Sequence, residues 1–137
     1  MNRIEDEIRL KRVLKEFSSD FHNSFTPFEL CDEMLDKLPM LNINQDILVM
    51  FNLEFIYTIK ERINNLDKVW FITPCEIKAQ VAEAIGVKKN HIFFYSYKDK
   101  EIEKIDNMPK FDVVIGNPPY HKGLHMKFLE IAFNNSK

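Results

Sequence analysis

The chain has 137 residues, 45% of them hydrophobic, which is enough for one domain with a real core. It contains no apolar run near the roughly 20 residues that a membrane helix needs, and its charged N-terminus is unlike a signal peptide, so we expect a cytoplasmic protein. A net charge of −2 argues against a self-sufficient nucleic-acid binder, and the spacing of Cys31 and Cys75 suits neither zinc nor redox chemistry, so no metal is expected.

The first predicted element is a helix over residues 2–18, a segment without Gly or Pro. Its imperfect apolar stripe consists of Ile4, Ile8, Val13, Leu14 and Phe17. A polar and aromatic connector follows. We therefore assign residues 1–24 to an N-terminal helix and connector, and residues 25–137 to a partial α/β domain.

A second helix is predicted to start at Thr26. Thr26 would be its N-cap, Pro27 would take the first helical position, and Glu29 would complete a capping box. The helix is expected to run to about Leu38 and to bury Leu30 among its apolar side chains.

The remaining chain alternates between strands and helices. Strands are predicted at 46–51, 68–72, 91–97 and 111–115, with helices at 54–66 and 124–133 and a short acidic segment before the last strand. After the second strand, Thr73 and Glu76 repeat the capping box before another helix, which Gly86 is expected to end as a glycine C-cap. The apolar face of that helix would consist of Ile77, Val81, Ala84 and Ile85. Such alternation predicts a doubly wound, mostly parallel α/β sheet with right-handed connections. In such sheets ligands bind at the carboxyl ends of the strands.

The most specific stretch is 111–120, where a β-branched run is followed by Gly116 and then Asn117, Pro118, Pro119 and Tyr120. Two prolines cannot extend a strand ladder, so these four residues should follow the strand's carboxyl end. The Asn117 side-chain carbonyl and the Pro118 backbone carbonyl could each accept a hydrogen from an aromatic amino group, which favours the pyramidal nitrogen that attacks a methyl group. Tyr120 offers a face on which a flipped-out base could stack. The alternative is a Pro-Pro turn with a surface tyrosine.

This stretch, opened by Phe111 and Asp112, resembles the catalytic motif of S-adenosylmethionine-dependent amino-methyltransferases, especially N6-adenine-specific DNA methyltransferases. The turn Phe25-Thr26-Pro27 resembles the motif with which that family wraps around the methionine end of the cofactor. The resemblance implies a Rossmann-like methyltransferase sheet, S-adenosylmethionine as cofactor, residues 117–120 as catalytic, and methylation of a flipped-out adenine in DNA, as in restriction-modification. Related Asn-Pro-Pro-Tyr enzymes modify RNA bases or a protein glutamine.

The sequence departs from the family pattern after the first strand, where related enzymes carry an acidic residue and a glycine-rich turn. Here the turn contains Asn52, Leu53 and Glu54, and the glycines of the chain are Gly86, Gly116 and Gly123. Either Asn52 or Glu54 holds the cofactor's amino group in a rebuilt site, or the cofactor does not bind. Asp99, after the third strand, could reach the cofactor's adenine amino group or cap the next turn.

Members of the family need several further strands and a separate domain that reads DNA sequence. We therefore expect a sheet truncated after its fourth strand and a methyltransferase domain that depends on further chain or on a partner protein. The alternative is a catalytically inactive methyltransferase-like module that binds nucleic acid or a protein partner. A third reading is a plain α/β scaffold.

Overall fold

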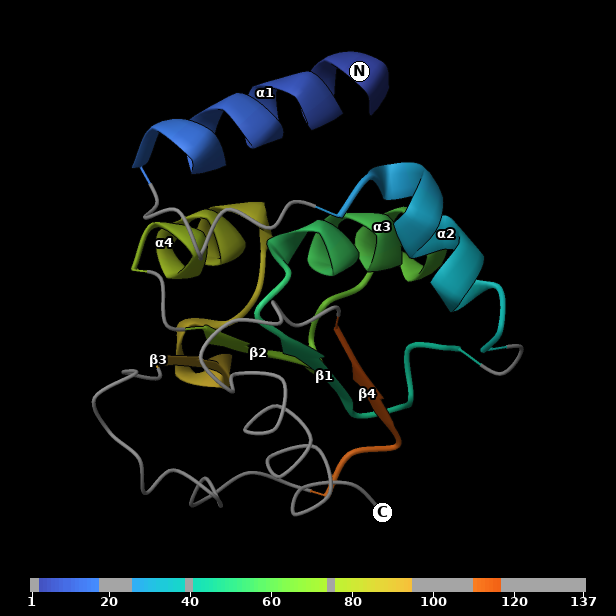
Figure 1. Ribbon diagram of the computed structural model, residues 1–137. Coiled ribbons are helices and arrows are strands. Elements are labelled where there is room, and N and C mark those ends of the chain that lie inside the picture. The colour runs from blue at the N-terminus through green and yellow to red at the C-terminus, as the bar shows by residue number, and fades with distance from the viewer. Residues whose placement is uncertain (1–2, 18–25, 39–40, 74–75, 95–109, 117–137) are drawn as a thin grey trace, which may run out of the picture.

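The structure is a computed structural model that describes residues 3–17, 26–38, 41–73, 76–94 and 110–116. Its helices are α1 (Arg3–Phe17), α2 (Phe28–Leu35), α3 (Leu53–Ile63) and α4 (Glu76–Ile85), with a 3-10 turn η2 (Lys89–His91). Its strands are β1 (Ile47–Met50), β2 (Val69–Thr73), β3 (Ile92–Phe94) and β4 (Val113–Ile115). Figure 1 shows α2, α3 and α4 on one side of the sheet, with α1 above them.

The strands form one parallel sheet in the order β3-β2-β1-β4, so the predicted α/β class is confirmed. Val49 of β1 pairs with Phe71 of β2 and with Ile115 of β4, which brings the carboxyl ends of these strands to one edge. The strand order changes direction at β1, because β2 and β3 extend the sheet to one side and β4 extends it to the other. This is the first part of the doubly wound dinucleotide-binding order, in which ligands bind where the direction changes.

The core has two parts, one on each face of β1, whose four residues are all buried. Ile47 and Val49 belong to the larger cluster under the helices, and Leu48 and Met50 belong to a smaller cluster on the opposite face. This alternation follows from the period of two in a strand, and full burial on both faces is typical of a central parallel strand.

The smaller cluster contains an aromatic group around Trp70. The Trp70 ring stacks on the His91 ring at a centroid distance of 3.7 Å and meets the Phe111 ring edge-on at 6.1 Å. Phe111 is 1% exposed and lies just before β4, so its ring ties the start of that strand to β2.

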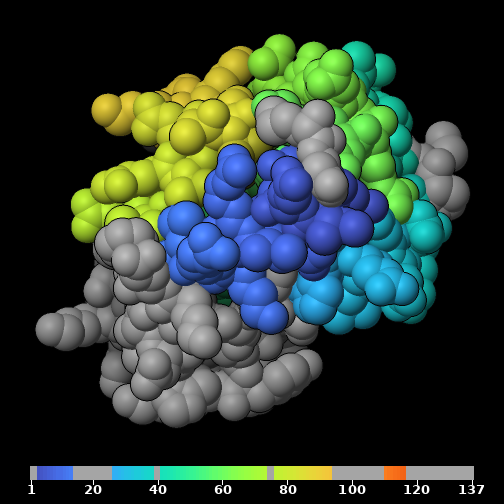
Figure 2. All heavy atoms as spheres, turned by 90° about the horizontal axis from the view of Figure 1, so that it is seen from above, coloured from blue at the N-terminus to red at the C-terminus, as the bar shows by residue number. Residues whose placement is uncertain are grey.

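Helix α1 lies across the other helices, as the view from above in Figure 2 shows. Leu10 inserts into the larger core cluster, while Ile4 and Ile8 remain 68% and 54% exposed, so much of the expected apolar stripe faces outward. The Glu7 side chain accepts a hydrogen bond from the backbone N–H of Phe28 at 2.8 Å. Helix α1 thus contacts the beginning of α2 directly. None of the helices in the described ranges is long and apolar enough to cross a membrane.

The predicted start of α2 at Thr26 is wrong. Pro27 is the N-cap, and the helix ends at Leu35 rather than near Leu38, with Leu30 39% exposed. The N–H of Thr26, which a capping box would pair with Glu29, donates instead to the side chain of Glu54 at 2.9 Å. Acceptors distant in sequence therefore replace the local capping pattern.

The predicted glycine end of α4 is confirmed. Gly86 has φ +131°, a conformation that L side chains rarely adopt, and the N–H of Val87 returns to the carbonyl of Ala82 at 3.1 Å. This is the bond pattern of a Schellman cap. It turns the chain toward η2 and the start of β3.

Candidate functional site

The turn from β1 into α3 has the backbone geometry of a glycine turn without a glycine. Phe51 has φ +70°, and the N–H of Asn52 donates to the carbonyl of Met50 at 2.8 Å, which is the hydrogen bond of a γ-turn. The N–H of Phe51 donates to the carbonyl of Ile72 in β2. Holding an L residue in this conformation costs about 1–2 kcal/mol, so the surrounding packing must stabilise it.

The bulky side chains of this turn pack into the two halves of the core. Phe51 joins the smaller cluster and is 6% exposed, whereas Leu53 is fully buried in the larger cluster below the helices. The two polar side chains, Asn52 and Glu54, are buried as well, at 1% and 0% exposure. Buried polar groups need partners, and Thr26 supplies several of them.

Thr26, Asn52 and Glu54 meet at the carboxyl edge of the sheet, although Thr26 is far from the other two in sequence. The N–H of Thr26 donates to Glu54 Oε2 at 2.9 Å, and the Asn52 side-chain amide donates to Thr26 Oγ1 at 3.3 Å and to Glu54 Oε2 at 3.5 Å. Three residues assigned to cofactor binding from the sequence thus lie together. Pro27, the residue after Thr26, is the N-cap of α2.

Glu54 has one carboxylate oxygen without a partner. Oε1 is buried and has no hydrogen-bond partner among the described residues, whereas Oε2 is held by Thr26 and Asn52. Burial raises the pKa of Glu54, and the positive charge of Lys78 acts in the opposite direction. An unsatisfied buried carboxylate oxygen is costly, which makes it a candidate acceptor for a cationic ligand.

Cys31 lies close to this cluster but has the features of a structural residue. It is fully buried, and its thiol lies 3.7 Å from the carbonyl of Thr26. Burial, followed by the charge of Glu54, raises the pKa of the thiol to about 12. A thiol of this kind is unreactive at neutral pH. Within the described residues, no group of three His, Cys, Asp or Glu side chains is arranged to hold a metal ion.

Lys78 is a component of this edge that the sequence analysis missed. It lies in the first turn of α4, is 5% exposed, and its ammonium group donates to the carbonyl of Phe51 at 3.1 Å. The expected inward face of α4 was wrong in part, because Ala84 is exposed whereas Lys78 and Ala82 are buried. Their spacing of four residues is the one signal that could have indicated this face.

Strand β4 leads directly to the same edge. The Asp112 side chain accepts a hydrogen bond from the N–H of Asp46 at 2.9 Å, and the N–H of Asp112 donates to the carbonyl of Asp46 at 2.9 Å. This pair fixes the register in which Ile115 lies beside Val49. Gly116 ends the described part of this segment. The predicted site residues Phe25, Asp99, Asn117, Pro118, Pro119 and Tyr120 lie outside the described residues.

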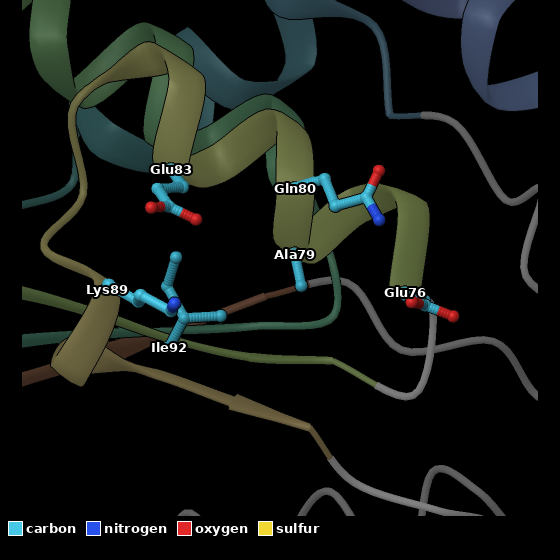
Figure 3. Close-up of a pocket in the computed structure, with 6 residues that line it drawn as sticks. All are labelled: Glu76, Ala79, Gln80, Glu83, Lys89 and Ile92. Carbon is cyan, nitrogen blue, oxygen red and sulfur yellow. The ribbon is translucent and has the colours of Figure 1, made fainter.

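A separate cavity of about 440 Å³ lies between α4 and the segment formed by η2 and β3. Figure 3 shows residues of α4, among them Glu76 and Glu83, on one side and Lys89 and Ile92 on the other. None of the predicted site residues in the described part of the chain lines it. It is therefore distinct from the cluster around Glu54.

The comparison with protein families gives a match to the Eco57I restriction-modification methylase family over residues 53–137, which is more than half of the chain. The chain belongs to this family. The matched region of this Eco57I-type chain begins at the first residue of α3 and includes positions 117–120. Membership indicates a DNA methyltransferase in general and, with it, the usual methyl donor of methylases, S-adenosylmethionine. A comparison with curated proteins gives no match.

Proposed function

We propose that this chain is an N6-adenine DNA methyltransferase domain that binds S-adenosylmethionine at the carboxyl edge of β1. The observation that carries the proposal is that β4 pairs with β1 and ends beside the turn that contains Asn52 and Glu54. Ile115, the last residue of β4, pairs with Val49 of β1, and in the sequence Gly116 and the segment 117–120 follow it. Methyl transfer requires the methyl donor to lie close to the residues that bind the adenine amino group. The pairing of β4 with β1 supports such an arrangement.

The side chains at this edge fit the cofactor chemically. The methionine part of S-adenosylmethionine ends in an ammonium group, and Glu54 Oε1 is a buried acceptor without a partner. Asn52 and Thr26 orient the carboxylate through Oε2. In this proposal Phe25 and Pro27 complete the loop around the methionine end, and Asp99 accepts from the cofactor's adenine amino group. When bound, the cofactor supplies an electrophilic methyl group.

The proposed catalytic residues act on the target base. The Asn117 side chain and the Pro118 carbonyl accept the two hydrogens of the adenine amino group, Pro119 keeps the acceptors rigid, and Tyr120 stacks on the flipped-out base. Held by Thr26, Asn52 and Glu54, the cofactor would supply the methyl group, and the acceptors at Asn117 and Pro118 would favour the pyramidal nitrogen that takes up this group and loses a proton. DNA is the proposed substrate, and further chain or a partner protein would supply sequence recognition.

The test is methyl transfer to adenine-containing DNA by the chain with Asn117→Ala, alone and with any partner needed for activity. We expect turnover to be abolished while the thermal unfolding of the chain is unchanged, because asparagine has no apolar side chain whose burial could be lost. Asn90→Ala is the matched control, since Asn90 is exposed and lies before the amino end of β3. Retention of most of the turnover by Asn117→Ala would refute the assignment.

A second candidate is a catalytically inactive methyltransferase-like module that binds nucleic acid or a protein partner. The bulky, strained Phe51 in a turn that carries glycines in related enzymes supports this alternative. Calorimetric titration of the chain with S-adenosylmethionine separates the two candidates. Micromolar binding supports the enzyme, and absence of binding together with retained DNA binding supports the inactive module.

A further inference from the structure

Lys78 brings a positive charge into the interior beside the glycine-free turn. Its side chain belongs to the first turn of α4 and is 5% exposed. A lysine is rarely buried to this extent unless its charge is balanced and its ammonium group is hydrogen-bonded. The carbonyl that accepts the hydrogen bond from Lys78 and the carboxylate on which its charge acts both belong to the segment 50–54.

The hydrogen bond from Lys78 ends on the strained residue of the turn. The ammonium group donates to the carbonyl of Phe51, the residue with φ +70°. This bond from α4 fixes the peptide unit that joins Phe51 to Asn52, and hence the direction in which Asn52 and Glu54 leave the turn. In a glycine-rich turn no such tie is needed, because glycine adopts positive φ without steric cost.

The charge of Lys78 also acts on Glu54. The groups that face this carboxylate are Thr26 and Asn52, which bind Oε2, the thiol of Cys31 from α2, and the ammonium group of Lys78 from α4. Of these, Lys78 carries the opposite charge. A buried carboxylate with such a neighbour retains its charge more readily than an isolated one, and Oε1 still makes no hydrogen bond.

We propose that Lys78 is a positioning residue for the methyl donor: it fixes the turn through the Phe51 carbonyl and balances the charge of Glu54, whose Oε1 then accepts the ammonium group of S-adenosylmethionine. This inference rests on the proposed function. It assigns to a lysine of α4 the task that a glycine-rich turn performs through its own backbone. Lys78 itself does not touch the reacting atoms.

The experiment compares two ligands by calorimetry on the 137-residue chain. S-adenosylmethionine carries the ammonium group, and 5′-methylthioadenosine lacks the whole amino-acid part. Lys78→Met removes both charge and donor, Lys78→Gln keeps a donor but no charge, and Lys88→Met changes an exposed lysine as the control. We expect both Lys78 variants to weaken S-adenosylmethionine binding roughly 10- to 100-fold and to leave methylthioadenosine binding unchanged.

The pH dependence supplies a readout that a purely structural role would not change. Affinity of the wild type for S-adenosylmethionine should fall in acid as Glu54 gains a proton, and in Lys78→Gln this fall should occur at higher pH, because the neighbouring positive charge is gone. Equal loss of affinity for both ligands, or no loss for either, would overturn the inference and leave the proposed function standing. A wild type that binds neither ligand would overturn both.

Discussion

At the residue scale, Phe51 carries the greatest local conflict in the described chain. Its backbone has the left-handed conformation of a glycine, yet its side chain belongs to the smaller core cluster together with Leu48, Met50, Ile72 and Phe111. Burial of the ring stabilises the folded chain and so offsets the free-energy cost of the strained backbone. The turn at the carboxyl edge of β1 thus has a shape that a glycine would adopt at lower cost.

Comparison of Phe51→Gly with Phe51→Ala separates the effect of backbone strain on stability from the effect of losing the buried ring. Both variants lose the ring, so both should be less stable than the wild type. At an ordinary position glycine is about 0.5–1 kcal/mol less favourable than alanine, but at positive φ the order should reverse, with Phe51→Gly the more stable by about 1 kcal/mol. Urea denaturation measures the difference.

The control for this pair is Ala84→Gly in the exposed face of α4, where glycine should lower the free energy of unfolding by about 0.5–1 kcal/mol. If alanine is also the more stable residue at position 51, the left-handed conformation of the turn is wrong.

At the scale of elements, α1 completes the beginning of α2. The Glu7 carboxylate accepts from the N–H of Phe28 in the first turn of α2, where negative charge is also favoured by the helix dipole. Arg3 of the same helix forms ion pairs with Asp32 and Glu61, which are partly exposed and contribute little. Helix α1 thereby supports the loop from which Thr26 reaches Glu54.

We expect Glu7→Ala to lower the free energy of unfolding by about 1 kcal/mol, the usual effect of losing a helix cap. Glu5→Ala on the exposed side of the same helix is the matched control and should have little effect. Chemical denaturation measured by circular dichroism tests the pair. Equal stability of the two variants would show that the contact with Phe28 does not support α2.

The alternation of strands and helices was predictable because it depends on local apolar periodicity, as in the continuous run Ile47–Met50 and the glycine end of α4 at Gly86. The cap of α2 was not predictable in this way. Thr26 and Pro27 form a good local start signal, but the acceptors that decide the geometry are Glu7 and Glu54, each more than 20 residues distant.

The residues of the candidate site differ in the same way: some could be predicted from the local sequence, and one could not. Asn52 and Glu54 could be proposed because they follow a strand end, and Thr26 because its motif resembles a known one. Lys78 escaped prediction because Ile77 and Val81 suggest a helix face that excludes it. The packing of α4 against the turn at Phe51, whose carbonyl accepts a hydrogen bond from Lys78, favours the burial of this lysine.

At the scale of the whole molecule, Glu54 links global stability to pH. Its pKa in the folded chain is raised above the value of 4.5 by burial, so between these two values the folded state binds more protons than the unfolded state. Stability due to this group is therefore greatest in acid and falls as pH rises through that window.

Glu54→Gln should lack this dependence. Relative to the wild type, its free energy of unfolding should increase as pH rises above about 4.5, by about 1.4 kcal/mol for each pH unit inside the window, and should then reach a constant difference. Urea denaturation from acid to neutral pH measures it, with Glu29→Gln on the exposed side of α2 as the control. A difference that stays constant or decreases with pH would contradict the assignment.

The aromatic group around Trp70 gives the molecule an optical reporter of its own. Trp70 is the sole tryptophan of the chain, and its ring contacts the stacked His91 ring and the Phe111 ring that precedes β4, so we expect its emission to respond to changes in either contact. Burial lowers the pKa of His91, which disfavours a positive charge beside the indole ring. Changes in fluorescence on adding DNA or cofactor would therefore report the position of Phe111, just before β4, relative to Trp70 of β2 without any attached dye.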